Sequence, residues 1–424
     1  MDPDTKRSLL GRRAVALLLG AAALAVCTSL RAGPRGLVVH EWGTFLSVQG
    51  PDGVSLGGMV DSEEDLPVFV EERTNKESWV RALMRQKMET PVTYFYTDHE
   101  MTVECRVDMP HGVLTHWFPS VFKLGPGKHS DPTPSSTFLD WGPVHLIPDL
   151  AAGKSGWNPP PMREVPAGST WRFARETDSA FVRTAKRIVS RGKHEHDHEK
   201  FLFYRGLGAF ELPLEVRSEG EGSLRLDVKN RGKGTIRGIL GLDVAKDGIG
   251  FSVLGDLAGG EGHVVNAPSS LWVRLPLEEG VVQVKDTLAR ILVAAGLYEK
   301  EARAMVNTWE KSYFRSEGLR VLYILPRETV DEVIPLQIRP APAEVVRVMV
   351  GRVEVLTPGK VALLEAWLQD LDSASPGARE TARRSIDELG RFAEPALHRV
   401  ASSSRLPGVP ARAEALLKKI AERS

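Results

Sequence analysis

The sequence predicts an α+β protein with β-rich, sandwich-like modules first, an α+β segment next and a helical segment at the C-terminus. Residues 101–109 alternate apolar and polar side chains, which is typical of a strand with one buried face. Residues 284–309 carry apolar side chains at helical spacing, and residues 319–325 and 345–356 are strand-like runs. Residues 359–424 show helical stripes throughout. Strands therefore dominate the first part of the chain and helices the last.

These elements divide the chain into five predicted segments. They are a signal peptide at 1–32, a β-rich domain with long loops at 33–170, a second β-sandwich-like module at 171–270, an α+β segment at 271–358 and a helical segment at 359–424. Residues 123–169, within the first domain, are rich in Gly, Pro and Ser. Because such a composition does not suit a sheet interior, it predicts a long surface connection.

The first 32 residues are predicted to direct export. Four basic residues precede an uncharged apolar run at 14–26, which is short for a membrane span. A buried N-terminal helix or a single membrane anchor is the alternative. Cys27 ends a segment similar to a lipoprotein box, so both a lipid on Cys27 and cleavage after Ala32 are open. We expect a periplasmic, cell-envelope or extracellular protein that meets the membrane only through the signal peptide or that lipid.

Composition excludes several classes of protein. Of 424 residues, 42% are hydrophobic and 26% charged, which is ordinary for a soluble globular protein and excludes a rod, a disordered tail or a multi-span membrane protein. The 55 basic and 55 acidic residues give a formal net charge of zero. A nucleic-acid binder would carry a basic excess, so we expect no nucleic-acid partner.

Four motifs stand out between residues 38 and 358. They are His-Glu-Trp-Gly-Thr-Phe at 40–45, Lys-Met-Glu-Thr-Pro-Val at 87–92, Lys-Phe-Leu-Phe-Tyr-Arg-Gly-Leu-Gly at 200–208, and a late helix containing Leu-Tyr-Glu-Lys-Glu-Ala at 297–302. Together they resemble an uncharacterised family of exported bacterial proteins that has no established activity. The resemblance therefore implies export but no reaction. His116 stands where the family pattern has an acid, so no site is built on it.

Polar residues in these motifs are candidate catalytic groups. His40 and Glu41 begin a zinc-protease pattern, but Thr44 replaces the second histidine that the pattern needs. His40 and Glu41 could still act as metal ligands, or as a base and the group that orients it, with Glu89 added from another strand. Arg205 would then bind an anionic group. The alternative is that His40 and Glu41 make structural hydrogen bonds at the start of a strand.

The chain's densest group of metal-binding side chains lies at residues 194–199, which alternate histidine with acid. An extended backbone would place His194, His196 and His198 on one face. Three imidazoles suit a divalent transition metal such as zinc. A solvated loop that binds metal without a defined role is the alternative.

The helical segment at 359–424 is similar to HEAT-like repeats, in which short helices are joined by tight turns. Ser375-Pro376 is a good helix start, and Glu394-Pro395-Ala396-Leu397 resembles the second helix of a repeat. One or two repeats cannot bury a core by themselves. We therefore expect this segment to pack against the rest of the chain or against a partner.

Two functions follow from these patterns. The first is a non-catalytic binding or scaffold protein of the envelope, which recognises a protein or glycan partner through the β modules or the helical segment. The second is a metal-dependent hydrolase that uses His40, Glu41 and Glu89. The absence of a complete catalytic motif favours the first.

Overall fold

The computed structural model describes most of the chain after residue 35. The described residues are 36–58, 66–73, 84–126, 137–149, 158–184, 187–189, 193–220, 224–267 and 272–423. The predicted signal peptide at 1–32 and Cys27 lie outside them. The chain divides into two compact units, Met1–Arg35 and Gly36–Ser424, and every feature described below belongs to the second.

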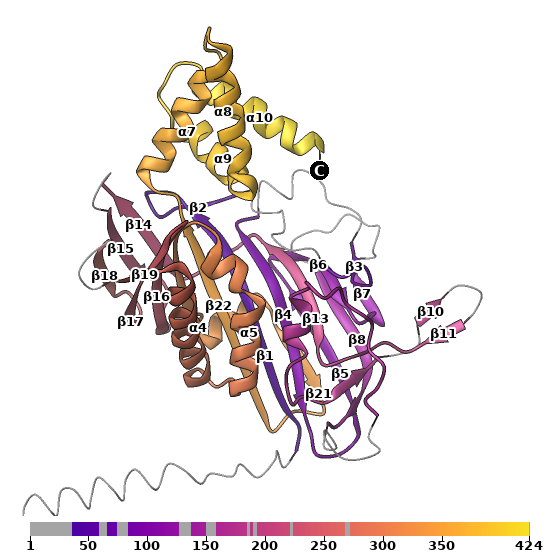
Figure 1. Cartoon of the computed structure of the whole chain (residues 1–424). Coiled ribbons are helices and arrows are strands. Elements are labelled where there is room, and N and C mark those ends of the chain that lie inside the picture. Colours follow the sequence, from indigo (N-terminus) through magenta and orange to yellow (C-terminus); the bar gives the residue numbers. More distant parts are fainter. Residues whose placement is uncertain are drawn as a thin grey trace, which may run out of the picture. The chain divides into compact units, whose positions relative to one another are not determined.

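An eleven-stranded sheet forms the centre of this unit (Figure 1). Its order is β19 (Val273–Pro276), β17 (Gly248–Leu257), β16 (Ile236–Ala245), β20 (Gly318–Ile324), β22 (Glu344–Val355), β1 (Val38–Gln49), β4 (Gln86–Tyr96), β13 (Leu202–Gly208), β6 (Gly112–Phe118) and β3 (Glu71–Glu72), with β2 (Ser55–Leu56) paired to β1. β1 runs parallel to β22 and antiparallel to β4. Every residue of β1 and β4 is buried, so both faces of these central strands are covered.

This sheet joins segments that the sequence predicted as separate modules. β1, β4 and β6 come from residues 33–170, β13, β16 and β17 from 171–270, and β20 and β22 from 271–358. The predicted boundaries at 170/171 and 270/271 therefore separate strands that are members of one hydrogen-bonded sheet.

Smaller sheets lie beside it. A six-stranded sheet has the order β12 (His198–Glu199), β9 (Phe181–Arg183), β8 (Thr137–Ile147), β5 (Met101–Met109) and β21 (Leu336–Arg339), with β7 (Lys123–Gly125) paired to β8. A three-stranded sheet joins β14 (Leu214–Glu219), β15 (Leu224–Asn230) and β18 (Gly262–Ala267). A two-stranded sheet pairs β10 (Arg187–Val189) with β11 (Lys193–Glu195). The predicted alternation of residues 101–109 is confirmed as β5. Cys105 lies on its buried side, where burial raises the pKa of the thiol.

The predicted surface connection at 123–169 is wrong over part of its length, because β8 lies within it. β8 pairs with both β5 and β9. Its Gly142 has a φ of 59° and lies opposite Cys105, next to a register shift between β5 and β8. A bulge at this point accommodates the Gly-Pro pair of β8, which is why a segment with this composition can still form a strand.

Helices cover one face of the large sheet (Figure 1). They are α3 (Trp171–Ala174), α4 (Leu277–Ala294), α5 (Glu299–Thr308) and the π-helix η2 (Lys311–Arg315). Their buried residues share a hydrophobic core with Trp42 of β1 and Val92 of β4. The opposite face of the sheet shares a second core with β5, β8 and α6 (Arg327–Val333). We call these the helical face and the opposite face of the sheet.

The C-terminal segment is helical, as predicted, and packs on the end of β1. It contains α7 (Pro358–Asp370), α8 (Pro376–Glu388), α9 (Ala393–Ser403) and α10 (Val409–Arg423). Ser375 caps α8 by accepting a hydrogen bond from the backbone N–H of Ala378, which confirms the predicted start. Leu46 and Val48 of β1 belong to the same hydrophobic core as these helices. Among the described helices, none combines the length and the hydropathy that crossing a membrane requires.

Candidate functional site

The helical face of the sheet is interrupted by a bulge in β4. Between Val92 and Glu89, β4 has one residue more than its partner segment in β1, and it also has one more than its partner in β13. Thr90 lies at this bulge with a φ of 48°, a left-handed conformation that is costly for a β-branched residue. Gly43 of β1 allows the close approach, because a Cβ there would lie 2.8 Å from the Cα of Pro91. Two of the sequence motifs thus meet backbone to backbone.

His40 points toward the helical face, where Glu301 of α5 holds it. His40 Nδ1 lies 2.7 Å from Glu301 Oε2, and the Tyr96 hydroxyl donates to Glu301 Oε1 at 2.8 Å. The backbone N–H of Tyr298 also donates to Glu301, which closes the first turn of α5. Burial, followed by the negative charge of Glu301, raises the pKa of Tyr96 far above its usual range. The group that orients His40 is therefore Glu301 and not Glu41.

Glu41 lies on the opposite face, because successive side chains of a strand alternate. Its carboxylate accepts hydrogen bonds from Arg347 Nε at 2.6 Å and from the Tyr204 hydroxyl at 2.6 Å, and all three side chains are almost fully buried. Burial lowers the pKa of Arg347, but the attraction of Glu41 outweighs it and the pKa is raised. Arg347 also binds Asp331 of α6. Glu41 is thus the centre of a buried ion pair that joins β1, β22 and α6.

Glu89 and Arg205 lie on the helical face beside the bulge. Glu89 faces Thr44 across the strands and forms a buried ion pair with Lys87 at 3.5 Å. Since His40 and Thr44 are four residues apart, Glu89 lies on the order of 13 Å along the sheet from His40. One metal ion cannot bind both side chains at that spacing. Among the described residues, no group of three His, Cys, Asp or Glu side chains is placed to hold a metal ion.

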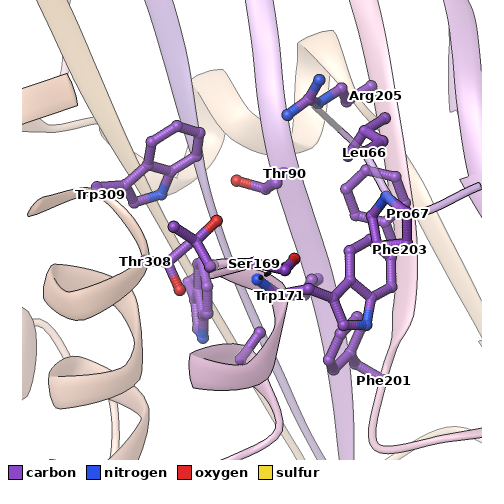
Figure 2. Close-up of a pocket in the computed structure, with 14 residues that line it drawn as sticks. Leu66, Pro67, Thr90, Ser169, Trp171, Phe201, Phe203, Arg205, Thr308 and Trp309 are labelled. Atoms are coloured by element: carbon purple, nitrogen blue, oxygen red, sulfur yellow. Dashed lines mark hydrogen bonds between the residues drawn. The ribbon is translucent and has the colours of Figure 1, made fainter. Parts of the chain in front are cut away.

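A narrow pocket lies between the bulge and the helices (Figure 2). We call it the tryptophan pocket; its walls are Trp42, Leu66, Pro67, Thr90, Val92, Ser169, Thr170, Trp171, Ala174, Phe201, Phe203, Arg205, Thr308 and Trp309. Its cavity volume is about 20 Å³, which is room for about one water molecule. Three of the four sequence motifs contribute walls, and Thr308 and Trp309, at the end of the helix that carries the fourth motif, contribute another. Residues far apart in the chain therefore meet here.

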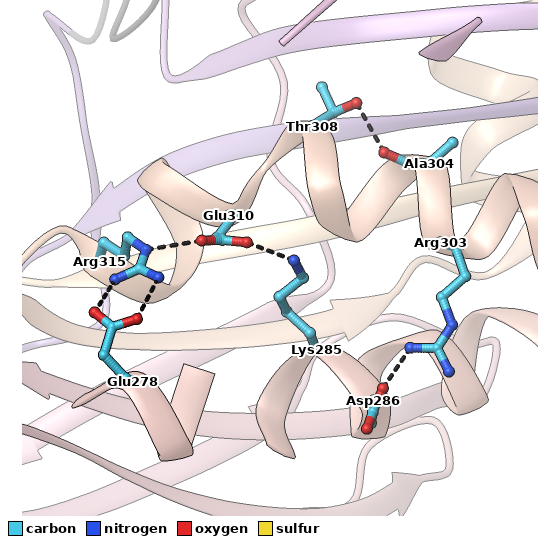
Figure 3. Close-up of polar contacts among 8 residues, drawn as sticks. All are labelled: Glu278, Lys285, Asp286, Arg303, Ala304, Thr308, Glu310 and Arg315. Carbon is cyan, nitrogen blue, oxygen red and sulfur yellow. Dashed lines mark hydrogen bonds and ion pairs between the residues drawn. The ribbon is translucent and has the colours of Figure 1, made fainter. Parts of the chain in front are cut away.

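An ion-pair network holds α4, the end of α5 and η2 together (Figure 3). Glu310 accepts hydrogen bonds from Lys285 of α4 and from Arg315 Nε of η2, the latter at 2.8 Å. Arg315 also binds both oxygens of Glu278. Glu310 follows Trp309 directly, so the network fixes the backbone that carries this wall of the pocket.

Replacing Glu310 by glutamine is expected to remove part of the protein's acid sensitivity. Partial burial raises the pKa of Glu310, but hydrogen bonds from Lys285 and Arg315 outweigh it and hold the pKa below the ordinary value of 4.5. Because the folded-state pKa is the lower one, its stabilisation is complete above about pH 4.5 and is lost as the pH falls through the folded-state value.

Urea unfolding at several pH values checks this prediction. Glu310→Gln should be less stable than the wild type by up to about 1 kcal/mol at pH ~6, and the two should converge near pH ~3. A difference in unfolding free energy that stays constant over this pH range would show that the charge of Glu310 does not contribute to stability.

The predicted histidine cluster does not lie on one strand: His194 lies in β11, His198 lies in β12 and His196 lies between them. The side chain of His194 lies outside the described residues, His196 is exposed and bonds the backbone oxygen of Thr184, and His198 is partly buried. Asp197 and Glu199 are buried. Asp197 is bound by Arg163, and Glu199 accepts hydrogen bonds from Arg175 and the Trp171 indole. These carboxylates anchor the segment, and the three-histidine metal site stays a prediction.

Two functional-site residues were not singled out by sequence reasoning. Glu301 lies within a recognised motif, but nothing in the chain's local pattern pairs it with His40. Arg347 carried a signal, because it is a charged residue in an otherwise apolar run, Val345-Val346-Arg347-Val348. A charge in such a run indicates a buried ion pair.

Comparisons with known proteins assign no family. No family model matches the chain, and no curated protein matches it either. Among solved structures, it is similar to the yeast delta-COP-I mu-homology domain complexed with a Dsl1 WxWxV peptide, at 8% sequence identity and a TM-score of 0.25, over 76% of this chain and 98% of that one. A second structure of the yeast domain matches at 8% identity and a TM-score of 0.26, with the same coverage. Likeness at this level supports no conclusion about fold or function.

Proposed function

We propose that the chain is an exported cell-envelope or periplasmic protein that binds a partner protein and does not catalyse a reaction. The contacts and positions of the candidate catalytic residues support this. Glu41 is neutralised by Arg347, His40 is held by Glu301 on the other face of the sheet, and Glu89 is distant from His40. The tryptophan pocket is too small for a substrate and a nucleophile together.

The observation that carries the proposal is a groove on the C-terminal helices. Its cavity volume is about 540 Å³, within the usual range for binding sites. Its apolar walls are Leu371, Ile386, Leu397, Leu416 and Ile420, and its charged walls are Arg383, Asp387, Glu394 and Lys419. An apolar floor with charges of both signs suits an amphipathic helix that carries acidic and basic residues beside its apolar stripe. A partner segment of this kind is the proposed ligand.

The proposal also includes a sandwich-like arrangement of the sheets and a HEAT-like arrangement of the C-terminal helices. The eleven-stranded and six-stranded sheets contribute to one hydrophobic core, which includes Phe45 and Tyr204 from the first and Val103 and Val144 from the second. This supports a sandwich-like arrangement. Short, successive helices that share a core support a HEAT-like assignment for α7–α10, in which the groove is the recognition surface.

Selection from a random peptide library with the full mature chain tests the proposal. We expect enrichment of sequences with an amphipathic helical pattern, and binding by the purified peptides at least about tenfold weaker for Leu416→Glu. Leu363→Glu is the matched control, because Leu363 is an exposed leucine of α7 that is not part of the groove. The proposal fails if no such pattern is enriched or if both variants bind equally. If the chain instead bound a glycan in a parallel glycan array, we would assign partner binding to a surface other than the groove.

A metal-dependent hydrolase that uses His40, Glu41 and Glu89 is the second candidate. One observation favours it: among the described residues, His40 Nε2 is buried without a hydrogen-bond partner, while Glu301 orients the other ring nitrogen. Metal-binding histidines often show this pairing. Elemental analysis would support this candidate if one metal per chain disappeared with His40→Ala. A metal-free wild type would eliminate it.

A further inference from the structure

The sheet of β14, β15 and β18 ends in a six-residue strand on each side, and only one of these two strands is covered. On β14, the Gln49 side chain accepts a hydrogen bond from the backbone N–H of Val216. The backbone N–H of Ser218 donates to the oxygen of Pro51. β18 lies on the side of β15 away from β14 (Figure 1). Among the described residues, β15 is its one strand partner, and residues 262–267 make no further backbone hydrogen bond with any of them.

β18 also lacks the features that usually protect the edge of a sheet. An uncovered edge is a template for pairing with another chain, and proteins protect it by shortness, charge, proline or a bulge. The strands that end the two larger sheets are short, since β3 and β12 have two residues and β19 and β21 have four. β18 has six residues with no Lys, Arg, Asp, Glu or Pro, and its pairing with β15 has no register shift. Its exposed residues are Gly262, His263, Val264 and Asn266.

Val264 is an apolar side chain on a charged face of this sheet. Side chains of paired residues share a face. The face that carries Val264 also carries Glu215, Arg217 and Glu219 of β14 and Arg225, Asp227 and Lys229 of β15. Val264 lies beside Asp227 and is 49% exposed. An apolar side chain on a further strand, opposite Val264, would remove it from water.

We propose that two copies of the chain form a dimer through β18, with the two strands antiparallel about a twofold axis at Val264. Such an axis places Val264 opposite Val264 of the second copy, and Gly262 opposite Asn266 of the second copy. The two three-stranded sheets then become one six-stranded sheet, and the backbone groups at the edge of β18 gain partners. This interface is separate from the groove on the C-terminal helices, which contains no residue of β18.

The charges of the two copies are compatible with this pairing. β18 adds no Lys, Arg, Asp or Glu at the junction. Asp227 lies three strand spacings, about 14 Å, from Asp227 of the second copy, and Lys229 lies equally far from Arg225 of the second copy. This distance exceeds the screening length of about 8 Å at physiological ionic strength. A second copy therefore offers an uncharged strand of the same length without bringing like charges together.

Sedimentation velocity of the full mature chain measures the association directly. We expect a monomer–dimer equilibrium within the range from ~1 to ~200 µM. Hydrogen exchange locates the interface. The backbone N–H groups of residues 262–267 should exchange more slowly at the high concentration than at the low one, whereas those of β19 should exchange at an unchanged rate.

Charged variants connect the dimer to β18. Val264→Lys places two positive charges opposite each other at the axis and should weaken dimerisation at least about tenfold, and Val264→Glu should do the same. An equimolar mixture of these two variants brings opposite charges together, so it should dimerise at least about tenfold more tightly than either variant alone. Val282→Lys is the matched control, because Val282 is a valine of α4 that is 60% exposed.

Four results would overturn the proposal. They are a monomer at every concentration, a dimer that Val264→Lys leaves unchanged, a mixture of the two charged variants that dimerises no better than each alone, and an equal loss of dimer with Val282→Lys. Leu416→Glu should dimerise like the wild type, so that failure of the groove and failure of the β18 interface are distinguishable.

Discussion

Replacing Arg347 by methionine is expected to lower the free energy of unfolding by about 3–5 kcal/mol. The change removes the guanidinium that lies 2.6 Å from Glu41 and leaves a fully buried carboxylate without its counter-charge. It also removes the donor to the backbone oxygen of Ile334. Chemical denaturation of the purified chain measures the loss.

Two further variants make this prediction specific. Arg327→Met breaks an exposed ion pair with Asp331, the acid that Arg347 also binds, and should cost at most about 1 kcal/mol. The double variant Glu41→Leu with Arg347→Met should recover much of the loss, because a buried pair replaced by apolar side chains leaves no isolated charge. Equal costs for Arg347→Met and Arg327→Met would contradict the assignment of Glu41 to a buried pair.

Replacing Glu301 by alanine is expected to cost about 3–5 kcal/mol. Glu301 is fully buried. Its Oε1 accepts a hydrogen bond from the Tyr96 hydroxyl, and its Oε2 accepts one from the backbone N–H of Tyr298 and also contacts His40. Each buried group that loses its partner costs about 1–3 kcal/mol, and the cavity adds to this. Denaturation with tyrosine fluorescence would register both the lost stability and the altered setting of Tyr96.

Glu299→Ala on the same helix is the matched control. Glu299 is exposed in the first turn of α5, so its replacement should change stability by no more than about 0.5 kcal/mol. If Glu301→Ala were as mild, the hydrogen bonds between α5 and β1 would not contribute to holding the helix on the sheet.

Secondary structure could be predicted from the sequence where apolar and polar side chains follow a single periodicity. Residues 101–109 form β5 with the predicted buried side, and Ser375 caps α8 at the predicted position. Alternation and capping depend on neighbours in the chain, so no distant residue is needed to predict them. β1 is different. It is buried on both faces, and a strand of this kind shows no alternation that would reveal which residues share a face.

The sequence by itself determined strands with a clear alternation such as β5, the C-terminal helical segment and the residues that stand out as polar groups in apolar runs. Only the tertiary structure decided their partners. His40 meets Glu301 across 261 positions of the chain, and Glu41 meets Arg347 across 306. The tertiary structure also placed the neighbours His40 and Glu41 on opposite faces of the sheet. It brought Thr90, Arg205 and Trp309 into one pocket. The physical reason is that strand order and register are set by burial of the whole sheet between two hydrophobic cores, which no local pattern encodes.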